Sequence, residues 1–259
     1  LVDNGSKEIT LLGQNVNAYK FKKENDIFRL SDLIFKLNEL NELKRIRYTT
    51  SHPKDVTKDL IEAHKSCKKL MPVLHLPVQS GSSKMLSAMN RKHSISDYYK
   101  IIDELKKVRS EIRFSSDFII GYPGETENDF NQTLELIEKV QFINSYSFIY
   151  SSRPGTPASK LSDVSPEIAK NRLIKLQELL EQNNFKYKKG LLAKSIEVLF
   201  ENKLNNQNKY FGRDKFLNSV IVESNQDLTG QILEVKIVDF NHNNLFGTIS
   251  INEKRNFAA

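Results

Sequence analysis

Short apolar runs and longer stretches of helical periodicity alternate along the first 150 residues. The apolar runs predict strands at residues 8–13, 45–50, 73–78, 113–120 and 145–150. Helical spacing predicts helices at 31–43, 57–67, 84–89, 96–108 and 127–139, the first with Ser31 as its N-cap. This alternation predicts an α/β fold with a parallel sheet and right-handed crossovers. Five strands are too few to close the usual eight-stranded barrel, so we expect an open or partial barrel.

The pattern changes after residue 150. Pro154, Pro157 and Pro166 interrupt it, and a long amphipathic helix is predicted at 165–188. Short strands are then predicted at 194–201, 211–213, 219–223, 230–239 and 246–251, separated by asparagine-rich turns. They indicate a small all-β barrel. We therefore expect two domains, residues 1–186 and residues 187–259.

Composition limits the possible partners and compartments. The net charge of +7 and the pI of about 9.2 permit a nucleic-acid partner without requiring one. No apolar run approaches the length of a membrane span. Cys67 is the single cysteine, which excludes an internal disulfide, fits a reducing cytoplasm and cannot supply the three or four thiolates of an iron–sulfur cluster. Because the chain begins with leucine, we expect it to be part of a longer protein.

Polar residues follow each predicted strand of the first domain. The most informative of these segments runs from Asp117 to Thr126, where Gly121 and Gly124 permit a tight turn and Thr126 with Asp129 forms a capping box. Asp117 begins an otherwise apolar strand and needs a polar partner. An ordinary turn with a solvated aspartate would explain this segment alone. Five such strand ends together predict one polar rim that binds a ligand.

Five segments resemble the radical S-adenosylmethionine (SAM) methylthiotransferases. They are 12–19 (Leu-Gly-Gln-Asn-Val-Asn-Ala-Tyr), 49–53 (Thr-Thr-Ser-His-Pro), 75–82 (His-Leu-Pro-Val-Gln-Ser-Gly-Ser), 116–126 and 145–157. The similarity extends from about residue 8 to residue 251 and is strongest to the tRNA-2-methylthio-N6-isopentenyladenosine synthases. It implies a partial TIM-like barrel of the radical SAM type without its first strand, followed by a TRAM domain, a small RNA-binding β-barrel.

The resemblance also implies a reaction and its cofactors. One [4Fe-4S] cluster cleaves SAM to a 5′-deoxyadenosyl radical, a second cluster carries sulfur, and a methylthio group replaces hydrogen at C2 of an isopentenylated adenosine beside the anticodon. The resemblance implies a cytoplasmic, monomeric enzyme with tRNA as substrate and a flavodoxin or ferredoxin as electron donor. The family's Cys-x-x-x-Cys-x-x-Cys loop and its N-terminal cysteines are not in this sequence. We therefore expect the chain alone to be inactive, with no catalytic or metal-binding residue of its own.

Seven positions match the family's cofactor-binding motifs: Gln14, Ser51, Gln79, Arg91, Asp117, Ile119 and Gly121. The resemblance implies that the first three hold the methionine and ribose ends of SAM, that the two charged residues form a polar wall, and that the last two contact the adenine. Five basic residues are the candidates for RNA contacts: Arg153, Lys188, Lys189, Arg213 and Lys215.

Other interpretations of the same sequence stay open. The basic residues of the second domain could be a solvated surface with the neighbouring aromatic rings in its core. The chain could be a non-catalytic RNA-binding remnant or one half of a split protein. It could also act on threonylcarbamoyladenosine in tRNA or on a ribosomal-protein aspartate. A partial-barrel enzyme for a phosphorylated metabolite is disfavoured, because the rim is rich in amides and hydroxyls but has few cations.

Overall fold

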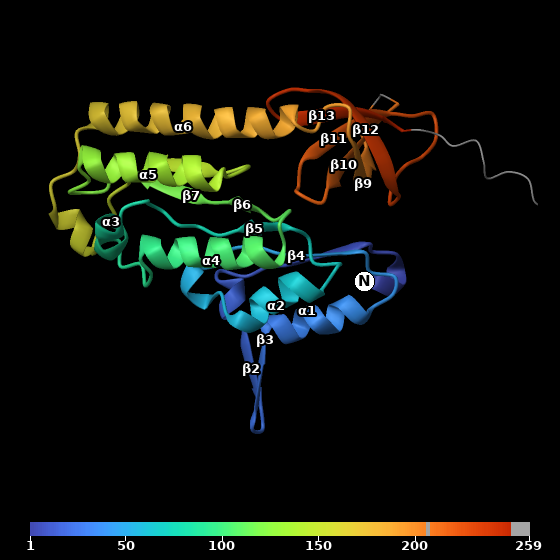
Figure 1. Cartoon of the computed structure of the whole chain (residues 1–259), viewed down its shortest axis with the longest axis horizontal. Helices are drawn as coiled ribbons and strands as arrows, with labels where there is room; N and C mark the ends of the chain where they lie inside the picture. The colour runs from blue at the N-terminus through green and yellow to red at the C-terminus, as the bar shows by residue number, and fades with distance from the viewer. Residues whose placement is uncertain (206–207, 250–259) are drawn as a thin grey trace, which may run out of the picture. The chain divides into compact units, whose positions relative to one another are not determined.

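The computed structural model describes residues 1–205 and 208–249, which form two compact units (Figure 1). One unit comprises Glu8–Asn184. The other comprises Leu1–Lys7 together with the chain from Phe185 onward. Each unit is described by itself below.

The first unit contains a run of parallel strands in chain order. Its strands are β1 (Glu8–Leu11), β4 (Arg45–Tyr48), β5 (Val73–His75), β6 (Arg113–Ser115), β7 (Asp117–Ile120) and β8 (Tyr146–Ile149). The parallel pairs β1–β4, β5–β6 and β7–β8 are linked by single parallel bridges, Ile46 to Leu70 and Gln79 to Phe118. The five predicted strands are confirmed, the fourth being divided at Ser116. This is the expected partial (β/α) barrel arrangement.

Helices connect these strands. They are α1 (Leu30–Glu39), α2 (Lys58–Ser66), α3 (Ser83–Ala88), α4 (Ile95–Val108), α5 (Glu127–Val140) and α6 (Pro166–Lys189). Helix α6 begins in the first unit, and its residues from Phe185 onward belong to the second. Short 3₁₀ helices lie at Val2–Asn4, Val16–Ala18, Pro53–Asp55 and Pro157–Lys160. None of the described helices is long and apolar enough to cross a membrane.

The start of α1 differs from the sequence prediction. Arg29 is the N-cap, and its amide donates to Asp32 over 2.7 Å. Ser31 lies inside the helix, where its buried hydroxyl donates to Asp59 of α2. Ser31 therefore joins two helices instead of capping one.

A hairpin that sequence reasoning missed precedes α1. Strands β2 (Lys20–Lys23) and β3 (Asp26–Arg29) pair antiparallel and project away from the rest of their unit (Figure 1). Glu24 adopts a positive φ of 55° at the turn. The signal was present in the apolar residues Phe21, Ile27 and Phe28 on either side of Glu24 and Asn25, a polar pair suited to a tight turn.

The sheet buries one face and leaves the other polar. Ile46, Leu74, Phe118 and Ile120 are at most 1% exposed. Aromatic residues hold the helices to this face: the hydroxyl of Tyr98 in α4 donates to the carbonyl of Leu76 over 3.0 Å. The alternating positions of β5 to β7 carry His75, Ser115 and Asp117. A strand that is apolar on one face only can thus present polar groups on the opposite face.

The second unit contains a closed barrel of five strands. They are β9 (Ser195–Lys203), β10 (Lys209–Asp214), β11 (Ser219–Glu223), β12 (Ile232–Phe240) and β13 (Asn244–Ile249), arranged in the order β10-β11-β13-β12-β9. Its core contains Val198, Phe200, Val220, Val235 and Ile237, all fully or almost fully buried. The predicted small barrel is confirmed. Residues 250 and 251 of its predicted last strand lie outside the described residues.

Candidate functional site

Asp117 finds its polar partner on the neighbouring strand. Its Oδ1 lies 3.6 Å from Nε2 of His75, whose Nδ1 lies 2.9 Å from the hydroxyl of Ser115. The side chain of Asp117 is 29% exposed, so it remains accessible at the polar face of the sheet. The predicted requirement for a partner is met within the protein, which leaves its second carboxylate oxygen available to a ligand.

Two of the predicted cofactor-binding residues carry buried donors without partners in the described structure. Ser51, which follows β4, is 5% exposed, and its hydroxyl has no hydrogen-bond partner. Arg91 donates from Nη2 to the carbonyl of Pro77 over 2.9 Å, while its buried Nε is unpartnered. Burial lowers the pKa of Arg91, and the charge of Asp117 opposes this shift. Since unpaired buried donors are unfavourable, these two are suited to a ligand or to ordered water.

Gln79 is held in an uncommon backbone conformation. Its φ of 79° lies in the left-handed region, which non-glycine residues rarely adopt. Its amide donates to the carbonyl of Asp117 over 3.0 Å, and its carbonyl accepts from Ile119 over 2.9 Å. These backbone bonds place Gln79 beside Asp117 and Ile119, and the contacts of all three with a cofactor stay predictions. Gln14 is an exposed loop residue after β1, and its role stays a prediction.

A histidine pair near Arg91 was missed as a candidate. His93 is 9% exposed, neither of its ring nitrogens has a partner in the described structure, and its ring meets that of His52 edge-on at 5.4 Å. Burial and the positive charge of Arg91 lower the pKa of both histidines to about 4. Both imidazoles are therefore neutral at physiological pH and can donate or accept a hydrogen bond. The only signal in the sequence was the polar run 91–93 after a short helix.

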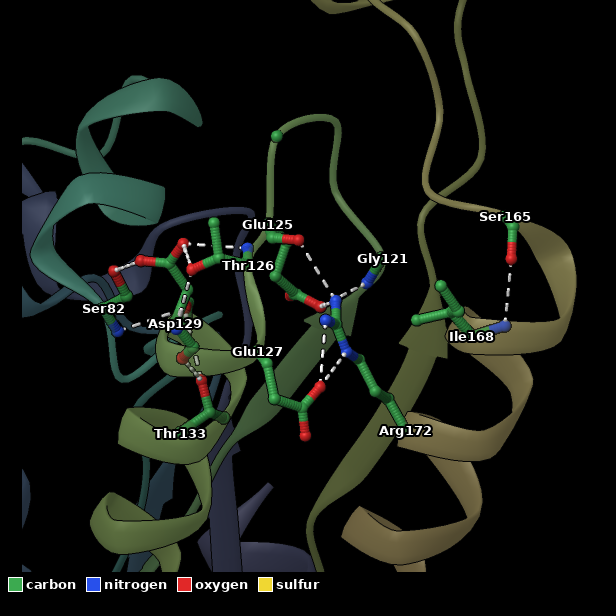
Figure 2. Close-up of polar contacts among 12 residues, drawn as sticks. Ser82, Gly121, Glu125, Thr126, Glu127, Asp129, Thr133, Ser165, Ile168 and Arg172 are labelled. Atoms are coloured by element: carbon green, nitrogen blue, oxygen red, sulfur yellow. Dashed lines mark hydrogen bonds and ion pairs between the residues drawn. The ribbon is translucent and has the colours of Figure 1, made fainter.

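The turn after β7 is closed by its own residues. Gly121 and Gly124 have φ values of +72° and +80°, and the amide of Glu125 donates to the carbonyl of Tyr122 over 2.9 Å. The predicted capping box is confirmed: the hydroxyl and amide of Thr126 donate to Asp129 (Figure 2). A Cβ on Gly121 would lie 2.8 Å from Cβ of Ala169 in α6. The close approach at Gly121 is thus to a helix, and a contact with the cofactor stays a prediction.

The polar residues after Gln79 attach α5 to the sheet. The Ser82 hydroxyl donates to Asp129 over 2.7 Å, and the Gly81 amide donates to the hydroxyl of Thr133 over 2.9 Å. Burial raises the pKa of Asp129, but the hydrogen bonds from Thr126 and Ser82 outweigh it and hold that pKa well below its usual range. These side chains therefore belong to a structural network.

Arg172 of α6 was also missed, and it contacts the same turn from the opposite side. Figure 2 shows its guanidinium between Glu125 and Glu127. Nη1 lies 2.8 Å from Oε1 of Glu125, and Nη2 lies 3.1 Å from Oε2 of Glu127. The side chains of Arg172 and Glu125 are 8% and 1% exposed. No local pattern in the sequence links residues so far apart along the chain.

The basic residues of the second unit differ in their surroundings. Lys188 is 4% exposed, and its ammonium donates to the carbonyls of His242 and Asn241, while burial lowers its pKa. Lys188 was predicted to contact RNA, but its burial and these two hydrogen bonds make it part of the fold of the second unit. Arg213 pairs with both carboxylate oxygens of Glu201 at 2.8 and 2.7 Å and lies over the ring of Phe211. Lys215 lies over the ring of Phe216 at 5.2 Å.

The remaining predicted RNA contacts are exposed. Lys189 ends α6 in the second unit, and Arg153 lies in the loop after β8 in the first unit. The structure thus brings Arg213 and Lys215 together with aromatic rings on the β10–β11 side of the barrel.

The described residues offer no group suited to a metal cluster. Among them, no three or more histidine, cysteine, aspartate or glutamate side chains are grouped so that they could hold a metal ion. Cys67 at the end of α2 is 1% exposed, and burial raises the pKa of its thiol. A buried, protonated thiol is a packing residue and a poor ligand.

Comparison with known proteins extends the picture. Residues 1–137 match the model of the radical SAM superfamily. The chain is 52% identical over 258 residues to the tRNA-2-methylthio-N(6)-dimethylallyladenosine synthase of Pelagibacter ubique, and 48% identical over 250 residues to that of a Wolbachia pipientis strain from Culex pipiens. It spans 58% and 57% of these relatives. Among solved structures, Streptococcus suis SuiB bound to S-adenosylmethionine matches with a TM-score of 0.44 at 16% identity, covering 68% of this chain and 37% of SuiB.

Proposed function

The chain belongs to the radical SAM superfamily, and we propose that it is the SAM-binding and RNA-binding part of a tRNA methylthiotransferase. The proposed reaction replaces the hydrogen at C2 of N6-isopentenyladenosine, also named N6-dimethylallyladenosine, with a methylthio group. The observation that carries this proposal is the 52% identity to the Pelagibacter ubique synthase over 100% of this chain. The cytoplasm, where tRNA is modified, is the proposed site of action.

The polar rim of the first unit is the proposed cofactor site. The unpartnered donors of Ser51 and Arg91 and the accessible carboxylate of Asp117 fit the polar groups of SAM, namely its carboxylate, amine and ribose hydroxyls. We assign Gln14 and Gln79 to the same polar groups, and Ile119 and Gly121 to the adenine. When bound, SAM supplies the radical and the methyl group of the reaction. The residues of this chain bind and orient it and keep neutral imidazoles beside Arg91.

The iron–sulfur clusters need ligands from outside this chain. Cys67 is the single cysteine of the sequence and is buried at the end of α2. We propose that two [4Fe-4S] clusters are bound elsewhere in the full-length protein, which we expect to act as a monomer with a flavodoxin or ferredoxin as electron donor. The chain alone is expected to bind SAM without turnover.

The second unit is the proposed RNA-binding TRAM domain, and we place its boundary near residue 187. Arg213 and Lys215 next to aromatic rings provide cations and stacking surfaces, the combination that small barrels use on RNA. Lys189 and Arg153 are the further proposed contacts. In a filter-binding assay with an anticodon stem-loop RNA, Lys215→Ala should weaken binding and reduce its salt dependence. Substitution of the buried Lys188 should instead lower stability.

Nucleoside analysis of tRNA tests the reaction. Disruption of the gene should abolish 2-methylthio-N6-isopentenyladenosine and leave N6-isopentenyladenosine, as measured by mass spectrometry of digested tRNA. The full-length protein should restore the modification, and its Asp117→Ala variant should restore little. Loss of methylthiolated threonylcarbamoyladenosine, or of ribosomal-protein methylthiolation, with intact isopentenyl product would identify a different branch. Loss of none of them would contradict the proposal and favour a non-catalytic RNA-binding protein.

A further inference from the structure

We propose that Arg172 is a positioning residue for the cofactor turn, which we define as Gly121–Thr126. It acts through Glu125, whose buried carboxylate closes that turn. The inference deepens the proposed function, because it rests on the assignment of SAM to the rim that this turn borders. Arg172 lies outside all the motifs from which a cofactor role was predicted.

The carboxylate of Glu125 is the link between Arg172 and the backbone of the turn. Oε1 accepts the amide of Gly121 over 3.2 Å and a guanidinium hydrogen bond from Nη1 of Arg172 over 2.8 Å. The side chain thus reaches back across the turn to Gly121, the residue that follows β7. The carboxylate of Glu125 is largely removed from water: its side chain is 1% exposed, and this burial raises the pKa of Glu125.

Arg172 is itself held in one orientation. Nη1 also donates to the carbonyl of Glu125 over 3.2 Å, Nε and Nη2 donate to Glu127, and the guanidinium lies 5.6 Å from the centre of the Phe130 ring. A planar fork with five donors can make these contacts at once, whereas the ammonium of lysine cannot. Ala169, one helical turn before Arg172 in α6, contacts the turn at Gly121. Residues Ala169 and Arg172 of α6 therefore contact the turn at Gly121 and at Glu125.

The consequence follows from the chemistry of a buried charge. Without Arg172, an ionised Glu125 carboxylate would be nearly unpaired inside the protein, and such a buried charge is strongly unfavourable. The side chain would become protonated or turn toward water, and either change weakens the bond that holds the Gly121 amide. The turn, with two residues at positive φ, would then lose the constraint that fixes it at the rim.

Lys84 provides a matched control on the opposite side. Its ammonium donates to the carbonyl of Gly124 over 3.1 Å and lies 3.0 Å from Asp129, but its side chain is 59% exposed. Its partner Asp129 is buried, but Ser82 and Thr126 also donate to that carboxylate, so the charge of Asp129 stays hydrogen-bonded without Lys84. Removal of the exposed Lys84 should therefore have a smaller effect than removal of Arg172.

The test compares Arg172→Gln, the double variant Glu125→Gln/Arg172→Gln and Lys84→Gln in the full-length natural protein. Hydrogen exchange of peptides covering residues 118–127 and calorimetric titration with SAM are the two readouts. We expect Arg172→Gln to speed exchange in the turn and weaken SAM binding, each by about 10-fold or more. The double variant should regain much of both, because no buried charge is left unpaired. Lys84→Gln should change each by less than about 3-fold.

A lowered unfolding midpoint for Arg172→Gln with wild-type exchange in the turn and wild-type SAM affinity would overturn the proposal, because it would show a merely structural role. If Arg172→Gln does not fold, Arg172→Lys replaces it with the same expectations, since lysine keeps the charge but loses the forked contacts. Failure of the wild-type protein to bind SAM would contradict the proposed function alone. The exchange result would still decide whether Arg172 holds the turn.

Discussion

Two sides of the same rim satisfy their polar groups in different ways. On the side of β4 and the chain that follows α3, Ser51, Arg91 and His93 bury polar atoms that have no partner in the described structure. On the side of β7 and α5, the buried Ser82, Glu125 and Asp129 all have hydrogen-bond partners. Ser82 donates to Asp129, which also accepts from Thr126, and Glu125 accepts from Gly121. The first side is suited to a ligand, whereas the second is a rigid support. Polarity at a strand end therefore does not by itself identify a binding residue.

The largest expected effect is on the support side, at Gly81. A Cβ there would lie 2.3 Å from the carbonyl oxygen of Gln132, which is backbone of α5 and cannot move aside. Gly81→Ala should lower the free energy of unfolding by about 3 kcal/mol, measured by urea denaturation. Gly124→Ala is the control: its φ is +80° but nothing lies within 4 Å of the added Cβ, so backbone strain alone should cost about 1 kcal/mol. Equal losses would show that the contact with α5 is not close.

A smaller loss is expected at Asp129. Asp129→Asn removes the charge that receives hydrogen bonds from Thr126 and Ser82, and it should cost about 1–2 kcal/mol at neutral pH. Since the pKa of Asp129 is lowered in the folded state, its contribution is present above the ordinary value of 3.8 and is lost as the pH falls below it. The variant should therefore lose less stability than the wild type in that acid range.

The exposed capping box of α4 gives the matched comparison for Asp129. Asp97 accepts from the amide and hydroxyl of Ser94 in the same geometry but at the surface. Asp97→Asn should destabilise the protein less than Asp129→Asn in the same denaturation series. If the two variants were equal, burial of the Asp129 network would contribute nothing beyond an ordinary helix cap.

The ligand side should show a different pH window. The pKa of His93 falls from 6.5 to about 4 on folding, so the unfolded chain takes up the proton first and stability is lost as the pH falls from about 6.5 to about 4. His93→Phe keeps an aromatic ring beside His52 and removes both unpartnered nitrogens. It should be as stable as the wild type at pH 7 and should flatten the pH dependence in that window. An unchanged slope between pH 6.5 and 4 would mean that His93 is not buried as a neutral ring.

The sequence allowed contacts within a segment to be predicted better than contacts between distant segments. Strand positions, the closed barrel and the Thr126–Asp129 box follow from local periodicity and from spacings of a few residues, which a single sequence contains. The contact between Glu125 and Arg172 and the histidine pair 52 and 93 join distant segments, and no local pattern encodes them. Lys188 was misplaced for the same reason, because its burial depends on the loop at residues 241 and 242.

The smallest expected effect on stability separates the two sides most directly. Ser51→Ala removes a buried hydroxyl that has no partner in the described structure, so the free energy of unfolding should change by less than about 0.5 kcal/mol, while SAM affinity should fall about 10-fold.

Ser80→Ala is the matched substitution on the support side. The Ser80 hydroxyl is also buried, but it accepts from the amide of Ser82 over 3.2 Å and lies 3.3 Å from the hydroxyl of Thr133. Ser80→Ala should cost about 1 kcal/mol and leave SAM affinity unchanged. The two serines must therefore show opposite responses in calorimetric titration and denaturation. If Ser51→Ala destabilised the protein as much as Ser80→Ala and left SAM affinity intact, Ser51 would belong to the support and the comparison would fail.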